Sequence, residues 1–196
     1  MKSMKDVIIH PSAVVDDGAA VGAGTRIWHF SHVMAGARIG ERCILGQNVF
    51  VGDGVVVGDG VKIQNNVSLY KGAVVEDDVF LGPSCVLTNV VNPRAFIERK
   101  SEFRSTVIRK GATIGANATV LCGIEIGSYA LIGAGAVVTK NVPAYAVMKG
   151  CPARQHGWVC VEGHILDEVA PGQFECPQTG KRFAIEGRVL VELEEA

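Results

Sequence analysis

The feature that most constrains the fold is an aliphatic residue that recurs every six positions. Steps of six from Ile9 to Leu87 meet Ile, Leu or Val at all fourteen positions, and the rhythm resumes from Ile108 to Val138 for six more. Two residues before each aliphatic, a small or β-branched residue is usual, since alternate side chains of a strand point to one side. Repetition of this kind predicts a solenoid of short strands, in which each repeat packs only on its neighbours.

Turn signals complete the repeat. Three residues after the aliphatic, Gly, Asn or Asp occupies fourteen of the twenty hexads, as a left-handed backbone conformation requires. Three strands and three turns would close a triangular coil of eighteen residues. The aliphatics then form three stacks: face A with residues 9, 27, 45, 63, 81, 114 and 132, face B with residues 15, 33, 51, 69, 87, 120 and 138, and face C with residues 21, 39, 57, 75, 108 and 126.

The predicted organisation follows from where the rhythm holds and where it breaks. We expect an all-β chain with a parallel β-helix over residues 7–141, making nearly seven coils and roughly 33 Å long at the usual strand spacing. An insertion of about residues 89–103 should protrude from the fifth coil. Residues 142–156 should close the helix, and residues 157–196 should form a small β appendage.

Composition excludes two classes of partner. The chain carries 19 basic and 20 acidic residues, so it has no basic field for a nucleic-acid backbone or an anionic membrane. The N-terminus lacks an apolar stretch of signal-peptide length, and nothing later is long and apolar enough to span a bilayer. We therefore expect a cytoplasmic protein whose six cysteines are reduced thiols.

Several segments resemble a known family. Hexads in which Gly follows the aliphatic resemble the left-handed parallel β-helix of the hexapeptide acyltransferases, and residues 142–154 resemble the segment that closes this helix in acetyl-CoA-dependent members. Residues 27–33, 63–70 and 88–94 are similar to the nucleotide-sugar 3-N-acetyltransferases, most of all to those that act on UDP-2-acetamido-3-amino-2,3-dideoxy-D-glucuronate.

The resemblance implies both an assembly and a reaction. It implies a homotrimer with active sites between subunits and with acetyl-CoA as co-substrate, without a metal. It also implies transfer of the acetyl group to a sugar 3-amino group in surface polysaccharide (lipopolysaccharide O-antigen) synthesis. Another dTDP- or UDP-linked amino sugar is an alternative substrate, and an O-acetyltransferase is an alternative activity.

The coil register collects polar side chains on one edge of the predicted helix. The corner between faces A and B should stack, one residue per coil, His29, Gln47, Asn65, Pro83, Ala116 and Ala134. A tetrahedral oxyanion needs a hydrogen-bond donor, and a base must come within reach of the amine. We take His29 as the candidate base, with His32 second, and Asn65 as a further catalytic residue. Gln47 and Asn66 are expected to bind substrate.

Simpler explanations of this polar column stay open. Asn48, Asn66 and Asn117 stand in the left-handed slot, where Asn can serve as a turn residue only. The column that begins with His29 could also be an exposed polar ladder or a contact between subunits.

Small residues on the same edge suit acetyl-CoA. Ala116 and Ala134, with glycine neighbours, would leave a smooth groove with free backbone donors for the pantetheine arm. Lys149 and Arg154 follow and could bind the CoA phosphates through charge-assisted hydrogen bonds. Ordinary solvated surface cations are the alternative explanation for this pair.

The insertion carries a local excess of basic residues. It contains or adjoins Asn89, Asn92, Arg94, Glu98, Arg99, Lys100 and Arg104. Loops of this length on a regular scaffold are usually functional. We hypothesise that the loop packs over a neighbouring subunit's groove, where Arg94 helps to bind the uronate carboxylate and the diphosphate. Asn89 and Tyr70, which lie in the matching segments, are expected to bind substrate too.

The C-terminal appendage resembles a degenerate zinc ribbon. Its two predicted knuckles, residues 157–164 and 174–183, contain Cys160, His164 and Cys176. A complete zinc site would have a second cysteine in each knuckle, where Glu162 or Gly163 and Thr179 stand. We therefore expect a metal-free β cap.

Two other functions compete on this solenoid. The first is a gamma-type carbonic anhydrase, which resembles a hexapeptide protein with three zinc-binding histidines at a subunit interface. Here His29 and His32 are three apart, and the positions one coil later are Gln47 and Phe50. A non-catalytic scaffold would need neither the polar column nor the closing segment.

Overall fold

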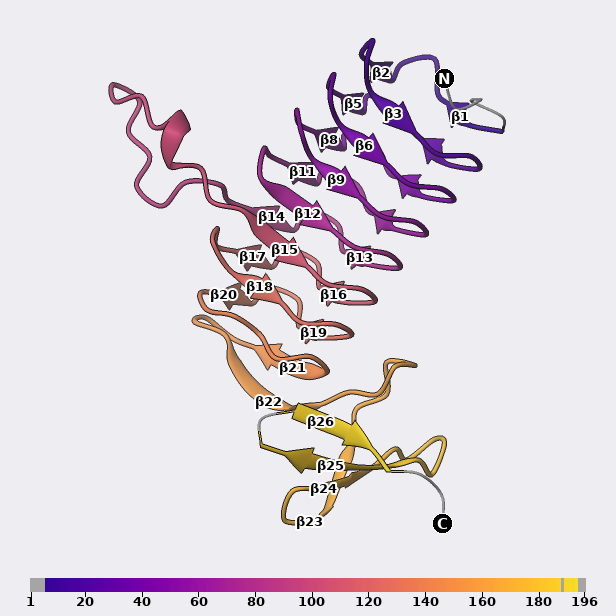
Figure 1. The fold of residues 1–196 in the computed structure, drawn as a ribbon, viewed down its shortest axis with the longest axis vertical. Coiled ribbons are helices and arrows are strands. Elements are labelled where there is room, and N and C mark those ends of the chain that lie inside the picture. Colours follow the sequence, from indigo (N-terminus) through magenta and orange to yellow (C-terminus); the bar gives the residue numbers. More distant parts are fainter. Residues whose placement is uncertain (1–5, 188, 194–196) are drawn as a thin grey trace.

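The computed structural model describes residues 6–187 and 189–193 as a left-handed parallel β-helix followed by a small antiparallel sheet (Figure 1). Face A consists of β1 (Ile8–Ile9), β4 (Arg26–Ile27), β7 (Ile44–Leu45), β10 (Lys62–Ile63), β13 (Phe80–Leu81), β16 (Thr113–Ile114), β19 (Leu131–Ile132), β21 (Ala146–Lys149) and β22 (Arg154–Trp158). Face B consists of β2 (Val14–Val15), β5 (His32–Val33), β8 (Phe50–Val51), β11 (Ser68–Leu69), β14 (Val86–Leu87), β17 (Thr119–Val120) and β20 (Val137–Val138). Face C consists of β3 (Ala20–Val21), β6 (Arg38–Ile39), β9 (Val56–Val57), β12 (Ala73–Val75), β15 (Thr106–Ile108) and β18 (Glu125–Ile126). Every predicted hexad lies in its predicted face.

Parallel pairing keeps the eighteen-residue register throughout the helix. Ile9 pairs with Ile27 in the first two coils, and Lys62 pairs with Phe80 further along. Across the insertion, Ala73 pairs with Thr106, so the loop adds fifteen residues and returns the chain to the same rung. Strand β21 adds one further rung beyond the predicted coils, because Ile132 pairs with Met148.

The interior is a continuous stack of the repeat aliphatics. Ile27, Leu45, Ile63 and Leu81 on face A are all fully buried, and the other two faces are filled in the same way. The second inward position is mostly buried too, and its buried polar residues are Thr25, Ser31 and Thr106. Hydrogen bonds between coils satisfy the hydroxyls of Thr25 and Ser31, whereas Thr106 Oγ1 has no hydrogen-bond partner among the described residues. For example, Thr25 Oγ1 donates to Gly40 O at 2.9 Å and accepts from the Cys43 amide at 3.0 Å.

Every Gly, Asn and Asp in the predicted turn slot except Asn141 has a left-handed φ, and so do several residues of other types. Asn48, Asn66 and Asn117 have φ values of 57°, 63° and 56°. Phe30 and Arg42 adopt the same conformation, at 57° and 55°, in the equivalent slot. The coil geometry therefore imposes this φ even where the side chain does not favour it.

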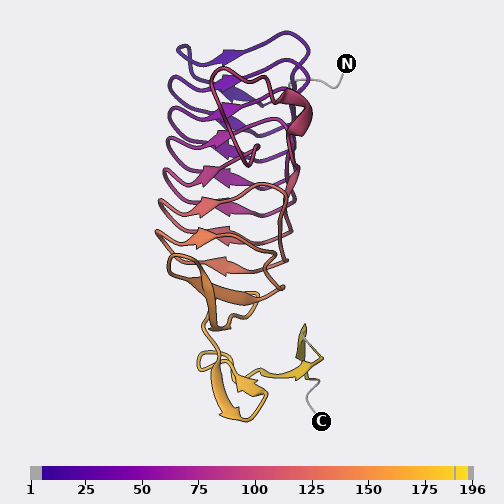
Figure 2. The same cartoon turned by 90° about the vertical axis from the view of Figure 1, so that its left-hand side faces the viewer.

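The inserted loop between β14 and β15 leaves the β-helix at the corner between faces B and C. Figures 1 and 2 show it projecting away from the coils and toward their N-terminal end. Its base is closed by the hydrogen bond from Arg104 N to Asn89 O, at 2.9 Å. Within the described residues, the one helical turn is η1 (Lys100–Glu102) in this loop, and no helix has the length and apolarity that a membrane span needs.

The C-terminal unit is a four-stranded antiparallel sheet of β23 (Asp167–Ala170), β24 (Gln173–Glu175), β25 (Arg182–Glu186) and β26 (Val189–Glu192). Strand β22 leads into it after pairing antiparallel with β21. The unit has its own small core, and Trp158 packs against both this core and that of the helix.

Glycine after the aliphatic permits the coils to stack closely at their corners. A Cβ on Gly82 would lie 2.7 Å from both Ala116 N and Ile114 O, which are backbone atoms of the next coil. At Gly52, which occupies the equivalent position on face B, the nearest atom would be Leu69 O at 3.1 Å. Neither glycine has a left-handed φ, so the difference between them is one of space.

We therefore predict that Gly82→Ala destabilises the protein by about 1–3 kcal/mol, the usual cost of overpacking. Gly52→Ala is the matched control. There, alanine lowers the conformational entropy of the unfolded chain, and this stabilising effect should offset most of the cost of the mild contact with Leu69 O. Chemical unfolding of both variants measures the difference. Equal stability of the two variants would contradict the close-stacking explanation.

Candidate active site

The corner between faces A and B, termed the A/B edge, stacks residues eighteen apart as predicted. Asn48 N donates to His29 O at 3.0 Å, and Asn66 N donates to Gln47 O at 2.9 Å. Further along, Gly135 N donates to Ala116 O at 2.8 Å. The backbone therefore holds His29, Gln47, Asn65, Pro83, Ala116 and Ala134 in one column.

Within this column, the His29 ring belongs to an aromatic cluster at the N-terminal end. It stacks on His10 with ring centroids 3.5 Å apart, and the Trp28 ring lies 6.4 Å away. His10 was not among the predicted site residues, because it stands one residue earlier in its hexad than His29. The stacking partner lies one coil toward the N-terminus, whereas Asn65 lies two coil steps, about 10 Å, toward the C-terminus.

His32, the second candidate base, lies on face B and not on the A/B edge. Its Nε2 is 3.1 Å from Asp16 Oδ1, and its ring meets the edge of Phe50 with centroids 5.8 Å apart. It is therefore placed to contact whatever covers face B.

The side-chain oxygen of Asn65 forms a hydrogen bond within the β-helix. Its Oδ1 accepts a 2.8 Å hydrogen bond from Gln47 N, one coil earlier. On the corner between faces C and A, the carboxylate oxygens of Asp59 and Asp77 accept the equivalent bonds from Glu41 N and Asp59 N. This recurrence shows a structural role for Oδ1 and leaves the Nδ2 group of Asn65 as the donor that a ligand could use.

Asn66 pairs with its neighbour in the column of left-handed turns. Asn48 Nδ2 donates to Asn66 Oδ1 at 3.1 Å on the exposed surface. The pair forms a short amide ladder beside Gln47 and Asn65.

The C-terminal end of the A/B edge carries the predicted cofactor residues. Gly133 N donates to Met148 O at 2.8 Å, and a Cβ on Gly133 would lie 3.2 Å from Lys149 Cγ. Lys149 pairs with Arg154 in the β21–β22 hairpin. Both cations therefore follow Ala116 and Ala134 on the same edge.

Arg154 also borders a hollow of ≈ 310 Å³ at the end of the helix. Its other lining residues come from the turn after β20 and from β21 and β22, and they include Lys140. The end of the helix thus offers cations around a concave surface.

Tyr70, Asn89 and Arg94 lie on a different edge, the corner between faces B and C, termed the B/C edge. Tyr70 follows β11 there, with its ring 5.9 Å from Phe50, and Asn89 stands at the base of the inserted loop. Within one chain, face B separates these three residues from His29 and Asn65. The structure therefore divides the predicted substrate and catalytic residues between two edges.

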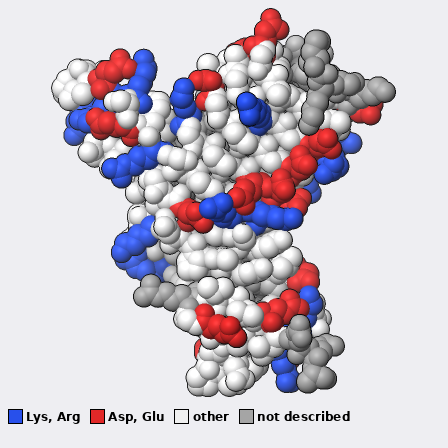
Figure 3. Space-filling model, in the orientation of Figure 1, with Lys and Arg blue, Asp and Glu red and all other residues white. Residues whose placement is uncertain are grey.

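The inserted loop is less basic than its composition indicates. Arg99 forms an ion pair with Glu102 at 2.8 Å, and Lys100 forms one with Glu98 at 3.1 Å. Figure 3 shows acidic and basic atoms side by side on this loop at the upper left. Among residues 6–187 and 189–193, Arg94 and Arg104 form no ion pair, so they are the loop cations left for an anionic ligand.

Face B differs from the other faces in charge. Its outward strand residues are Val14, His32, Phe50, Ser68, Val86, Thr119 and Val137, with no Lys, Arg, Asp or Glu. Arg26 and Lys62 stand outward on face A. At the end of face C, Arg109 forms ion pairs with Glu76 and Glu125 at 2.7 and 2.8 Å. The hydrogen bond from Arg109 also holds the pKa of Glu125 below its usual value.

The appendage contains a second cluster of reactive side chains. One ligand atom from each of Cys160, His164 and Cys176 can be chosen so that all three lie within 4.8 Å of one another. Burial by itself would raise the pKa of the Cys176 thiol, but hydrogen bonds from Thr179 and from backbone amides, with His164 beside it, lower that pKa to about 6.

Comparison with protein families identifies the repeat. The model described as bacterial transferase hexapeptide (six repeats) matches residues 18–53, 54–89 and 105–140. A second model, described as the hexapeptide repeat of succinyl-transferase, matches residues 36–71.

One curated relative aligns over almost the whole chain. It is the dTDP-3-amino-3,6-dideoxy-alpha-D-galactopyranose 3-N-acetyltransferase of Aneurinibacillus thermoaerophilus, 38% identical over 191 residues, which are 97% of each chain. A serine acetyltransferase of Buchnera aphidicola is 40% identical over 84 residues, which cover 43% of this chain and 28% of that one.

Solved structures share the fold. The acetyltransferase domain of PglB from Neisseria gonorrhoeae, in complex with acetyl coenzyme A, has a TM-score of 0.52 at 24% identity, with 79% of this chain and 60% of that one covered. The UDP-N-acetylglucosamine acyltransferase of Campylobacter jejuni has a TM-score of 0.55 at 14% identity, with 76% and 74% covered. The chain therefore belongs to the hexapeptide-repeat acyltransferases, in the same family as the 3-N-acetyltransferase that it matches from end to end.

Proposed function

We propose that the protein transfers the acetyl group of acetyl-CoA to the 3-amino group of a nucleotide-linked amino sugar. We further propose that it works as a homotrimer in the cytoplasm and supplies surface polysaccharide synthesis. The observation that carries the proposal is the A/B edge, where amide side chains give way to small residues and then to two cations. A relative with 3-N-acetyltransferase activity, similar over its full length, supports the same reaction.

Acetyl-CoA would lie along the A/B edge, in the C-terminal coils. Its phosphates would meet Lys149 and Arg154, and its pantetheine arm would follow Ala134 and Ala116. From β21, which carries Lys149, to the coil of Asn65 there are four coil steps, about 19 Å. An extended pantetheine arm can span this distance. The thioester would then arrive beside Asn65.

The chemistry at Asn65 needs few groups. The neutral sugar amine attacks the thioester carbonyl carbon, and the Asn65 Nδ2 group donates to the developing oxyanion. The tetrahedral intermediate collapses, the carbon–sulfur bond breaks, and the amine proton passes to the departing CoA thiolate. The ring of His29, the predicted base, stacks on His10 and lies two coil steps from Asn65. We therefore assign His29 to binding of the sugar nucleotide.

A trimer would reunite the two edges of the site. In a threefold ring with face B turned inward, the A/B edge of one subunit lies beside the B/C edge of the next. Face B suits this position because its outward residues are uncharged. The loop supports the same arrangement, since Phe96 is 83% exposed in the single chain and would be covered by a neighbour.

Two substrates fit the proposal on different grounds. The full-length relative is named for a dTDP-linked 3-amino-3,6-dideoxygalactose. The resemblance in the three motif segments favours UDP-2-acetamido-3-amino-2,3-dideoxy-D-glucuronate, which carries an additional carboxylate. Arg94 and Arg104 give the uronate a counter-charge, because Arg binds carboxylates in bidentate fashion.

The substrate is tested by release of the CoA thiol from acetyl-CoA across a panel of acceptors. We expect turnover with nucleotide-linked 3-amino sugars, fastest with the uronate, and none with their 3-hydroxy counterparts or L-serine. Arg94→Ala should raise the KM for the uronate by roughly tenfold, as loss of a charged hydrogen bond predicts. Turnover of L-serine alone would overturn the proposal, and an unchanged KM in Arg94→Ala would remove the role of the loop.

Asn65 can be tested without disturbing the fold. Asn65→Asp keeps the oxygen that accepts from Gln47 N, as Asp59 and Asp77 do elsewhere, so stability should stay within about 0.5 kcal/mol. Because the donor is lost, kcat should fall by roughly 100-fold or more. Asn65→Ala should lose about 1 kcal/mol of stability as well. Full activity of Asn65→Asp would show that only the structural bond matters.

Mixed trimers test whether the site is shared. Asn65→Asp damages only the A/B edge, and Asn89→Ala damages only the B/C edge, so each homotrimer should be inactive. After co-expression with different affinity tags and purification through both tags, each mixed trimer has one subunit boundary in three that joins two intact edges, and activity should return in that proportion. Mixed trimers without any recovery would place both edges in one subunit's site.

A further inference from the structure

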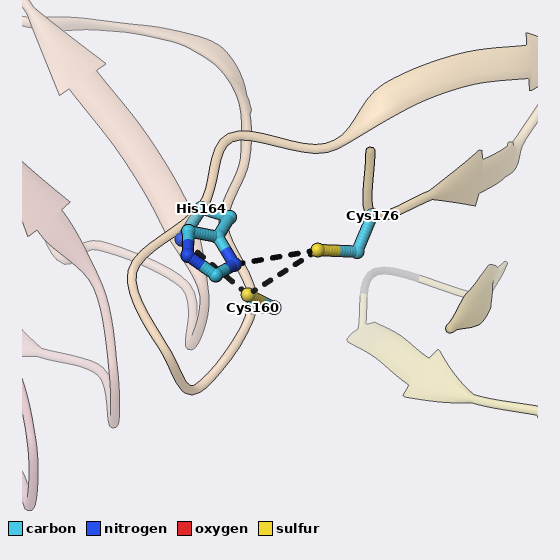
Figure 4. A group of neighbouring side chains, drawn as sticks. All are labelled: Cys160, His164 and Cys176. Carbon is cyan, nitrogen blue, oxygen red and sulfur yellow. Dashed lines mark hydrogen bonds between the residues drawn. The ribbon is translucent and has the colours of Figure 1, made fainter. Parts of the chain in front are cut away.

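The C-terminal unit brings three metal-binding side chains together from two separate turns. Figure 4 shows Cys160 and His164 on one turn and Cys176 on another, with their reactive atoms turned toward one another. The two sulfurs are 4.0 Å apart, and Cys176 Sγ is 3.5 Å from His164 Nδ1. Both cysteines are buried free thiols.

These separations match the edges of a zinc coordination tetrahedron. With zinc–sulfur bonds of about 2.3 Å and zinc–nitrogen bonds of about 2.0–2.1 Å, tetrahedral angles put two sulfurs about 3.8 Å apart and a sulfur and a nitrogen about 3.6 Å apart. The observed 4.0 and 3.5 Å differ from these values by small amounts. The third separation, between Cys160 Sγ and a ring nitrogen of His164, also lies within 4.8 Å. A small side-chain adjustment would therefore let one ion bind all three atoms.

The turns hold the cysteines in a form suited to a metal. In the first, Gly163 N donates to Cys160 O at 3.0 Å, and His164 N donates to Cys160 Sγ at 3.4 Å. In the second, Gly180 N donates to Cys176 O at 2.8 Å. Gly163 and Gly180 have φ values of 89° and 71°, which other residues adopt at a cost. A backbone N–H directed at a ligating sulfur is the kind of outer hydrogen bond that orients metal ligands.

The C-terminal unit is small enough that a bound metal would add needed stability. Among the described residues, the buried core of the C-terminal unit is Cys160, Leu166, Phe174, Cys176, Phe183 and Leu190, so two of its six members are the thiols. Cores of this size rarely stabilise a fold alone, and small domains add a metal or disulfides. Two thiolates and a neutral imidazole would also balance the charge of a divalent ion, which makes its burial acceptable.

In place of the metal-free appendage expected from the sequence, we propose that Cys160, His164 and Cys176 bind one zinc ion that fixes the C-terminal sheet. The fourth ligand would be an oxygen from the exposed side of the cluster. Gln178 Oε1, 3.9 Å from Cys176 Sγ, offers one directly or through water. The site is structural and separate from the A/B edge.

The test uses the full chain, purified with a reductant, stripped with a chelator and then loaded with zinc or cobalt. We expect one zinc per chain, seen as one added ion in the native mass spectrum. Cobalt should give the near-ultraviolet charge-transfer band of two thiolate ligands. Cys160→Ser, His164→Asn and Cys176→Ser should each lose stoichiometric zinc, whereas Cys151→Ser, which removes an exposed thiol elsewhere, should keep it.

Several results would overturn the site. These are loaded protein without zinc, cobalt protein without the thiolate band, and loss of zinc in Cys151→Ser. A native mass two hydrogens lower in place of an added ion would identify a disulfide. If a ligand variant fails to fold, the cobalt spectrum of the wild-type chain decides alone, since it reports the number of bound thiolates directly.

Discussion

Hydrogen bonding between coils at a fixed separation of eighteen residues is the constraint on which the rest of the structure depends. Each strand bonds to the strand one coil later, and the buried aliphatics lock that register because a slip of one residue would turn them outward. Columns of surface residues follow directly from this register. The inserted loop is tolerated because Ala73 still meets Thr106 on the expected rung.

The same constraint explains why the fold could be predicted from the sequence. An aliphatic residue marks the six-residue period in every coil from Ile9 to Val138, and the turn residues repeat with the same period. The column of His29, Gln47 and Asn65 could be predicted as well, since it needs only counting. The left-handed φ at Phe30 and Arg42 could not, because those side chains carry no turn signal.

Side-chain directions in the site were beyond the sequence for a different reason. The column places Asn65 one coil after Gln47, but the spacing does not show that Oδ1 accepts from Gln47 N, because a side-chain rotamer decides that bond. The stacking of His29 on His10 joins residues nineteen apart, a spacing outside the six-residue repeat. The sequence places Cys160, His164 and Cys176 in the two predicted knuckles, but it does not show that their side chains meet. Their cluster joins two turns by a contact in space, and its spacing does not match the paired cysteines of a complete ribbon.

The two halves of the proposed site follow from the triangular cross-section. A prism has three edges, and a ligand that touches two of them must either wrap around a face or lie between two prisms. Face B, with its uncharged outward residues, suits the second arrangement. The single chain would then carry two different half-sites, each useful only beside a partner.

The two ends of the β-helix are unequal, and this has a consequence for motion. At the C-terminal end, β21 and β22 cover the last coil, whereas Ile9, Val15 and Val21 of the first coil are only partly buried. In a stack where each rung contacts only its neighbours, fraying starts at the less protected terminus. Amide hydrogens of the first coil should therefore exchange fastest within the helix. Because His10 belongs to that coil, a sugar nucleotide bound at His29 would slow their exchange.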